Sequence, residues 1–132
     1  RRNQELVLKL LVERQQDVVI LFNDAESRSV RCKLVAEDEY THFPDGVLRY
    51  HVRLIELLAV CARGRIYESE VRCQSLLSVA DIQAQLADPT NLLEAKAALL
   101  GFFYEVYVMT EQACKEHGHQ TAFWQLLATL AT

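Results

Sequence analysis

Glycine and cysteine are scarce in this sequence, and what there is of each is scattered. The four glycines stand apart from one another, whereas a phosphate-binding loop needs several close together so that backbone amides can reach the anion. We therefore exclude nucleotide binding by a Rossmann or P-loop device. The four cysteines include no C-x-x-C pair. In a chain long enough to build its own core, we expect reduced, partly buried thiols in a reducing compartment.

Long apolar runs and an excess of positive charge are also missing. No stretch of about 18 consecutive apolar residues occurs, which excludes a conventional membrane-spanning helix within this sequence. The net charge is −4, from 14 basic and 18 acidic residues, so no overall positive field attracts nucleic acid. With 51% hydrophobic and 24% charged residues, the 132 residues are typical of one soluble globular domain. Because the sequence begins without methionine, we expect an excised segment of a longer protein.

Residues 47–63 have the periodicity of a helix that is apolar over more than half of its circumference. We expect Asp45 to cap its start and Gly64 to end it in a left-handed conformation. Charged residues, Arg49 and Arg53 among them, occupy the remaining face. The two adjoining apolar stripes are Leu48, Val52, Ile55, Leu58, Ala59 and Ala62, and Val47, Tyr50, Leu54, Leu57 and Cys61.

Residues 92–109 predict a second long helix, with apolar residues on nearly every side. Asn91 and Glu94 have the spacing of a capping box at its start. Gly101 lies inside the helix, where glycine costs about 1 kcal/mol relative to alanine. We therefore expect Gly101 to permit close approach of another helix, and the helix to be buried nearly all round.

The two long segments align with an offset of 45 residues, from Val47 opposite Leu92 to Cys61 opposite Val106. This offset lies within the range of armadillo and HEAT-type repeats. Two unrelated amphipathic helices also align by chance, so the pattern leaves both interpretations open. We predict an all-α fold, an armadillo/HEAT-like α-solenoid fragment, in which residues 1–132 form a single helical-repeat domain.

The rest of the sequence predicts shorter elements. The stretch 17–24 is ambiguous, because β-favouring residues run together with no partner strand, and we interpret it as a buried connector or a short helix. Turn signals occur at Pro44-Asp45-Gly46 and at Asp88-Pro89. The remaining predictions are helices over 3–14, 25–37, 67–77 and 79–87, a loop over 37–46, and a last helix capped by Thr121.

Candidate chemical sites are weak. Glu37-Asp38-Glu39 lacks the spacing of a calcium loop and is expected to be a solvated acidic loop. Cys114, His117 and His119 offer metal ligands, but no fourth ligand is nearby, so we predict no metal site. No nucleophile elbow and no assignable His–carboxylate pair occurs, and we expect neither catalysis nor a cofactor.

Five arginines fall within one region of the sequence, among several glutamates. This mixture favours a salt-bridged surface that faces solvent, with a partner-binding surface as the alternative. The five are Arg49, Arg53, Arg63, Arg65 and Arg72.

Several ordered strings go beyond composition. Residues 50–61 read Tyr-His-Val-Arg-Leu-Ile-Glu-Leu-Leu-Ala-Val-Cys, and residues 67–77 read Tyr-Glu-Ser-Glu-Val-Arg-Cys-Gln-Ser-Leu-Leu. Both resemble strings in the cytosolic helical region of the inositol trisphosphate receptor family, a region shared with ryanodine receptors. The resemblance extends over residues 17–124 and includes Tyr107-Val108 with Thr110-Glu111. Its motif and packing residues are Tyr50, His51, Leu54, Leu57, Leu58, Cys61, Cys73, Leu76, Leu77, Phe102, Phe103, Thr110 and Glu111.

The resemblance implies a non-catalytic regulatory and structural segment of a calcium-release channel. Such a channel is a homotetramer of the endoplasmic reticulum, and this segment would lie on its cytosolic side among neighbouring helical domains, without direct membrane contact. The family's ligand pocket and its activating calcium site lie outside the matching region, so no contact with either ligand is carried over. The alternative is a free-standing helical-repeat adaptor that binds a protein partner along the arginine-lined surface.

Overall fold

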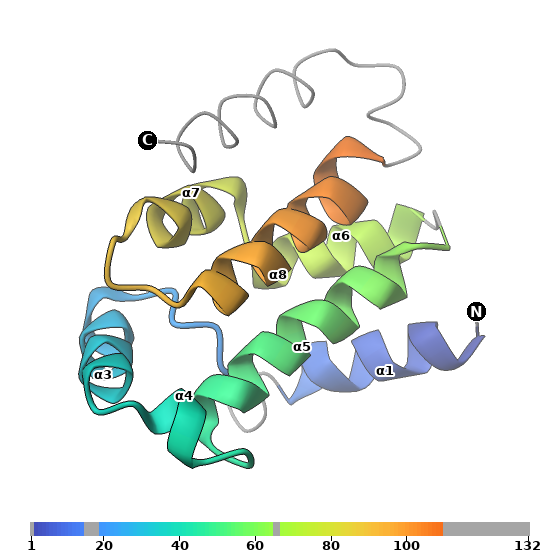
Figure 1. Cartoon of the computed structure of the whole chain (residues 1–132). Helices are drawn as coiled ribbons and strands as arrows, with labels where there is room; N and C mark the ends of the chain where they lie inside the picture. The colour runs from blue at the N-terminus through green and yellow to red at the C-terminus, as the bar shows by residue number, and fades with distance from the viewer. Residues whose placement is uncertain (1, 15–18, 65–66, 110–132) are drawn as a thin grey trace.

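The computed structural model describes residues 2–14, 19–64 and 67–109, and this part of the chain is all-helical (Figure 1). A π-helical turn, η1, continues the last α-helix of this described part. The elements in chain order are α1 (Arg2–Glu13), α3 (Ala25–Ala36), α4 (Glu39–His42), α5 (Val47–Ala62), α6 (Tyr67–Leu76), α7 (Val79–Ala87), α8 (Leu93–Phe103) and η1 (Tyr104–Val108). None of these helices is long and apolar enough to cross a bilayer.

Helix α5 is the central element of the fold. It packs against α8 and also contacts α1, α3, α4 and α6. Figure 1 shows that α5 and α8 run in the same direction, and that α3 and α4 lie together at one end of the molecule. The core lies among α1, α5, α6, α7, α8 and η1, because every helix-borne residue of the main apolar cluster comes from these elements.

The first apolar stripe of α5 is buried as predicted: Leu48, Ile55 and Leu58 have no exposed surface. The second stripe is only partly buried, since Tyr50 is 43% exposed and Leu57 is 41% exposed. Both predicted caps are wrong: the N-cap is Gly46, and Arg63 ends the helix in a right-handed conformation. Among the described glycines, none has a positive φ.

Helix α8 is less buried than its composition predicts. Phe102 and Phe103 are fully buried, but Leu93 is 73% exposed. The prediction for Gly101 is wrong, because the residue is exposed and an added Cβ would meet no neighbouring atom within 4 Å. The capping box is also absent: Leu92 is the N-cap, and the Asn91 side chain donates to the Gln85 carbonyl at 3.1 Å.

The predicted helix over 92–109 changes its winding at Tyr104, where η1 begins. The Met109 amide donates to the Tyr104 carbonyl, five residues back, at 2.8 Å. Side-chain hydrogen bonds connect η1 to α6 and to Leu77, the residue after α6. Gln74 donates to the Val106 carbonyl at 3.2 Å, and the Tyr107 hydroxyl donates to the Leu77 carbonyl at 2.9 Å.

The shorter helices follow the predicted ranges, with one addition. Helix α4 forms within the predicted loop over 37–46, after Asp38, which has a left-handed φ of 57°. Asp24 caps α3 by accepting from the Ser27 amide. Helix α7 begins with a capping box formed by Ser78 and Asp81, which the sequence analysis did not identify. The helix expected after Thr121 lies outside the described residues.

Candidate coupling site

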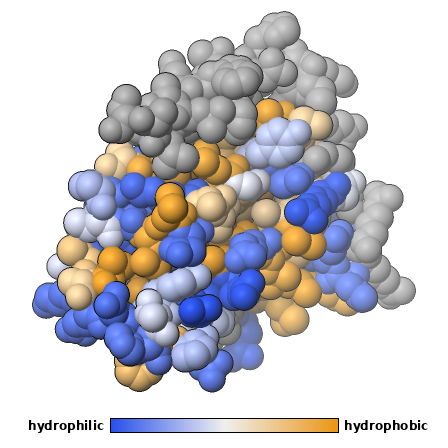
Figure 2. Space-filling view, in the orientation of Figure 1, coloured by the Kyte–Doolittle hydropathy of each residue, from blue (hydrophilic) through white to orange (hydrophobic). Residues whose placement is uncertain are grey.

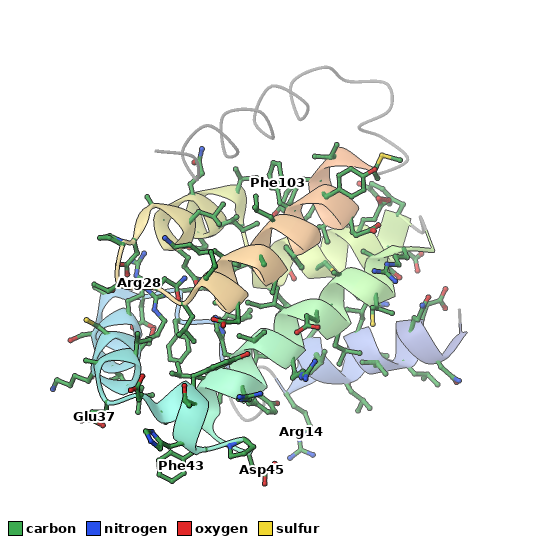
Figure 3. All side chains as sticks on the ribbon, viewed as in Figure 1. Arg14, Arg28, Glu37, Phe43, Asp45 and Phe103 are labelled. Carbon is green, nitrogen blue, oxygen red and sulfur yellow. The ribbon has the colours of Figure 1, made fainter. Side chains whose placement is uncertain are left out.

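Most of the motif residues lie in the apolar core of the described chain. Phe103, labelled in Figure 3, stacks on Tyr107 with ring centroids 5.4 Å apart. Tyr50 and Leu57 lie at the surface instead, and Thr110 and Glu111 fall outside the described residues. The motif residues that belong to the main core cluster are Leu54, Leu58, Cys61, Cys73, Leu76, Leu77, Phe102 and Phe103.

His51 differs from the other motif residues because it is polar and fully buried. Its Nδ1 lies 2.8 Å from the Ile20 carbonyl oxygen, and because a carbonyl only accepts, Nδ1 carries the proton. Nε2 is buried without a hydrogen-bond partner. Burial lowers the His51 pKa to about 4, the bond to Ile20 opposes this shift, and the charge of Arg31 adds to it. The imidazole is therefore neutral at pH 7.

Arg31 brings a buried positive charge from α3 to the same region. One of its terminal nitrogens donates to Gln85 Oε1 at 3.1 Å, and the other forms an ion pair with Asp88. Its guanidinium also lies 5.9 Å from the centre of the Phe22 ring. Burial lowers the pKa of Arg31 and the Asp88 charge opposes that change, but an arginine remains charged in proteins.

Asp88 completes the ion pair from the end of α7. Partial burial acts to raise its pKa, but hydrogen bonds from Thr90 and the charge of Arg31 outweigh it, so the pKa of Asp88 is lowered. Thr90 bonds to Asp88 Oδ1 through both its amide, at 2.9 Å, and its hydroxyl, at 2.7 Å. The carboxylate is therefore held in place for Arg31.

Gln85 connects these groups to the backbone of the chain before α3. Its Nε2 donates to the Leu21 carbonyl at 2.8 Å. Asn23 in turn donates to the Leu76 carbonyl at 3.1 Å. We call Asn23, Arg31, His51, Gln85 and Asp88 the polar cluster. It joins the connector over 19–24 to α3, α5, α7 and the end of α6.

The polar cluster attaches neighbouring elements of the fold to one another. Its hydrogen bonds mostly join its members to each other or to backbone carbonyls, whereas His51 Nε2 and Arg31 Nε have no partner. Among the described residues, no group of three or more His, Cys, Asp or Glu side chains has the arrangement of a metal site. In the apolar core, the thiols of Cys73 and Cys61 are protonated at pH 7, since burial raises the pKa of Cys73 to about 12 and also raises that of Cys61. A thiol in this form is a poor nucleophile.

The arginines on α5 pair with neighbouring groups of the chain. Arg53 lies 3.6 Å from Glu56, and Arg63 lies 3.5 Å from Glu105. Beside them, α5 and α8 enclose a shallow groove of about 500 Å³ with small residues such as Gly101 in its wall. Figure 2 views this face, where hydrophobic and hydrophilic residues alternate.

Sequence reasoning identified His51 by its motif and missed the other members of the polar cluster. Arg31 and Gln85 lie 54 residues apart, in helices whose sequences give no sign that they meet. Asp88 was assigned only to a turn, which the structure confirms. A polar residue gives no periodicity signal of burial, so the cluster had no local signature.

No protein-family model matches the sequence. The chain is similar to an inositol 1,4,5-trisphosphate receptor, itr-1, of Caenorhabditis elegans, with 30% identity over 69 residues. The aligned part is 52% of this chain and 2% of that receptor. The chain thus spans a very small share of the curated relative that it matches.

Proposed function

We propose that the chain is a non-catalytic regulatory and structural segment of an intracellular inositol trisphosphate-gated calcium-release channel. In this role it transmits conformational change through packed helices. The observation that carries the proposal is the similarity to the receptor of Caenorhabditis elegans. The ordered strings of residues 50–61 and 67–77, which resemble strings of that receptor family, also support it.

An armadillo-like arrangement is part of the proposal. The parallel course of α5 and α8 supports it, because equivalent helices of stacked repeats run in the same direction (Figure 1). Burial agrees at the aligned pairs Leu54/Leu99 and Leu58/Phe103, whose four members are all buried. It disagrees nearer the start of the helices, where Leu48 is fully buried and Leu93 is exposed. The repeat is therefore best supported over the second half of each helix.

The mechanism is displacement of stiffly packed helices. Leu58, Leu99 and Phe103 have no exposed surface, and close-packed interiors transmit displacement instead of absorbing it. Because α5 touches helices on several sides, a shift at one end of the segment reaches the other. The polar cluster extends this connection to α3.

The neighbours in this proposal are other helical domains of the same channel, a homotetramer on the cytosolic side of the endoplasmic reticulum membrane. Exposed apolar residues at the edges of the segment offer contact surfaces for them, since a slice of a helical array leaves its ends uncovered. Leu6 and Leu10 on α1 are 54% and 58% exposed.

The test is to tag the protein at its own gene and follow the full-length product. We expect a long polypeptide in endoplasmic reticulum membranes, as a complex of tetrameric mass, whose removal lowers inositol trisphosphate-evoked calcium release. Within that product, Leu58→Ala should reduce the release, and Leu57→Ala, at an exposed position of the same helix, should not. A short polypeptide recovered from the cytosol would contradict the proposal and favour the helical-repeat adaptor.

A further inference from the structure

Helices α3 and α4 are attached to the molecule in a different way from the other helices. All residues over 25–42, which we call the flap, are described, and none of them belongs to the main apolar cluster or packs against it. The fully buried side chain of α3 is Arg31, and the buried one of α4 is Glu39. The buried anchors of the flap are therefore charged, whereas its apolar residues Cys32, Leu34 and Val35 are only half-buried.

The first fastening is Arg31, which reaches from α3 to α7. Its bonds to Gln85 and Asp88 are directional, and both partners belong to the part of the chain outside the flap. A buried guanidinium is costly unless it is paired, and it regains hydration when it leaves the protein. When Arg31 is released into water, hydration of its guanidinium therefore offsets part of the free energy that is lost with the ion pair.

The second fastening is the Glu39 carboxylate at the start of α5. Its Oε2 accepts from the Leu48 amide at 3.2 Å, one of the helix N-terminal amides that lack a partner within the helix. Gly46, the N-cap, leaves room for this carboxylate: a Cβ at Gly46 would lie 1.6 Å from Glu39 Oε1. Glycine is thus needed at position 46 to make room for the Glu39 carboxylate. Its φ of −81° is one that any residue can adopt.

The third fastening joins Tyr40 of α4 to Arg49 of α5. The Arg49 Nε donates to the Tyr40 carbonyl at 3.0 Å, and its guanidinium lies 4.3 Å from the centre of the Tyr40 ring. Like the other two, this contact is polar, but it is only partly buried. Water can replace each of its bonds at modest net cost.

The flap ends at a joint on each side. Before it, Phe22 is buried and Asn23 is bonded to Leu76, so the chain is fixed as far as Asn23. After it comes the turn over 43–46, in which Phe43 is 60% exposed and Asp45 points outward with it (Figure 3). The next residue that is fully buried is Leu48.

We propose that the flap opens as a unit about these two joints while the remaining helices stay folded. Opening separates polar contacts that water can replace, and it leaves the main apolar cluster intact. It uncovers Gln85, Asp88 and the Phe22 ring, which Arg31 contacts in the closed state. The inference stands on the contacts within this chain and does not rest on the proposed function.

The test is hydrogen exchange of the whole chain, measured by mass spectrometry at peptide resolution. We expect amides over 25–42 to exchange at least about tenfold faster than the slowest amides of α5 and α8. Arg31→Leu should accelerate exchange over 25–42 by about a further tenfold, since bonds of a charged group are lost. Exchange in α5 and α8 should stay within about twofold of the wild type.

Lys33→Leu is the matched control, because it removes an exposed positive charge from the same helix. It should leave exchange over 25–42 unchanged. Gly46→Ala is a second, milder variant: it displaces the Glu39 carboxylate, and it should accelerate the flap alone. Equal acceleration of α5, α8 and the flap in either variant would overturn the proposal. So would an Arg31→Leu protein that fails to fold, because the other helices would then depend on the flap.

Discussion

The flap and the rest of the described chain illustrate two ways of holding helices in place. In α1, α5, α6, α7 and α8, apolar side chains meet without directional bonds, and the free energy grows with the area removed from water. In the flap, α3 and α4 are held by Arg31, Glu39 and the contact between Arg49 and Tyr40. The first kind of contact resists separation because exposed apolar surface is costly in water. The second can be exchanged for hydration.

The difference between the two kinds of attachment indicates which region of the molecule opens more easily. Regions with few buried apolar contacts open at lower free energy than the core. If the flap opens as we propose, the two kinds of attachment give the described chain a stiff part and a part whose position can change. The predictions below test how separate the two regions are.

The largest effect is expected from Leu58→Ala. Leu58 is fully buried at the centre of α5, and truncating such a side chain costs about 2–5 kcal/mol of unfolding free energy because a cavity remains. Chemical denaturation followed by circular dichroism gives the value. Leu57→Ala is the control: Leu57 is 41% exposed, so the loss should be below about 1 kcal/mol.

The Leu58→Ala and Leu57→Ala variants also test how the core helices respond in comparison with the flap. Leu58→Ala should lower the protection of every core helix together, because the cavity weakens the whole cluster. Equal losses from Leu57→Ala and Leu58→Ala would mean that α5 does not present the face described here to the core.

A second prediction concerns His51, which lies on α5 but beside Arg31 of the flap. Its pKa is lowered from 6.5 to about 4 in the folded protein, so the unfolded chain binds a proton first as the pH falls. The stability contributed by neutral His51 is therefore complete above pH 6.5 and is lost progressively toward pH 4. The full loss is about 3 kcal/mol.

Urea unfolding at a series of pH values from 7 to 4 measures this loss. His51→Gln should flatten the pH dependence within that window, whereas His42→Gln, at an exposed histidine of the flap, should keep the wild-type profile. If His51→Gln retains the full slope, the acid sensitivity belongs to another group and the burial of His51 has no such consequence.

Tyr107→Phe tests a single polar bond inside the apolar region. The Tyr107 hydroxyl donates to the Leu77 carbonyl at 2.9 Å in a buried setting, and its removal should cost about 1 kcal/mol. Thermal unfolding detects a change of this size. Exposed Tyr67→Phe is the control and should be neutral. A neutral Tyr107→Phe would show that the π-helical turn does not depend on this bond.

The sequence allowed the helices of the apolar region and α3 of the flap to be predicted, but not α4 or the way the flap is attached. Periodicity located α1, α5, α6 and α7, and the motif residues Leu54 and Leu58 are buried as expected. These predictions work because helical spacing reports directly which face is apolar. The position of α8 was predicted, but its burial was not, since that depends on how many neighbours reach it.

The polar cluster could not be predicted, for a physical reason. Arg31 can be buried because Gln85 and Asp88, more than 50 residues away, accept hydrogen bonds from its guanidinium. Asn91 was predicted to cap α8, yet its side chain bonds to the Gln85 carbonyl instead. In both cases the hydrogen-bond partner, 54 and 57 residues away for Arg31 and six residues away for Asn91, is not indicated by the local sequence pattern.

Two glycines provide the smallest and sharpest test of the comparison. Gly101 lies exposed within α8, where an added Cβ meets no atom within 4 Å, so Gly101→Ala should raise the unfolding free energy by up to about 1 kcal/mol through helix propensity. Gly46→Ala adds the same methyl group beside the flap, where it displaces the Glu39 carboxylate. We expect it to leave core protection unchanged and to speed exchange over 25–42. If Gly101→Ala instead destabilised the protein, another helix would have to lie close to Gly101. In the described part of the chain, no atom lies within 4 Å of the added Cβ.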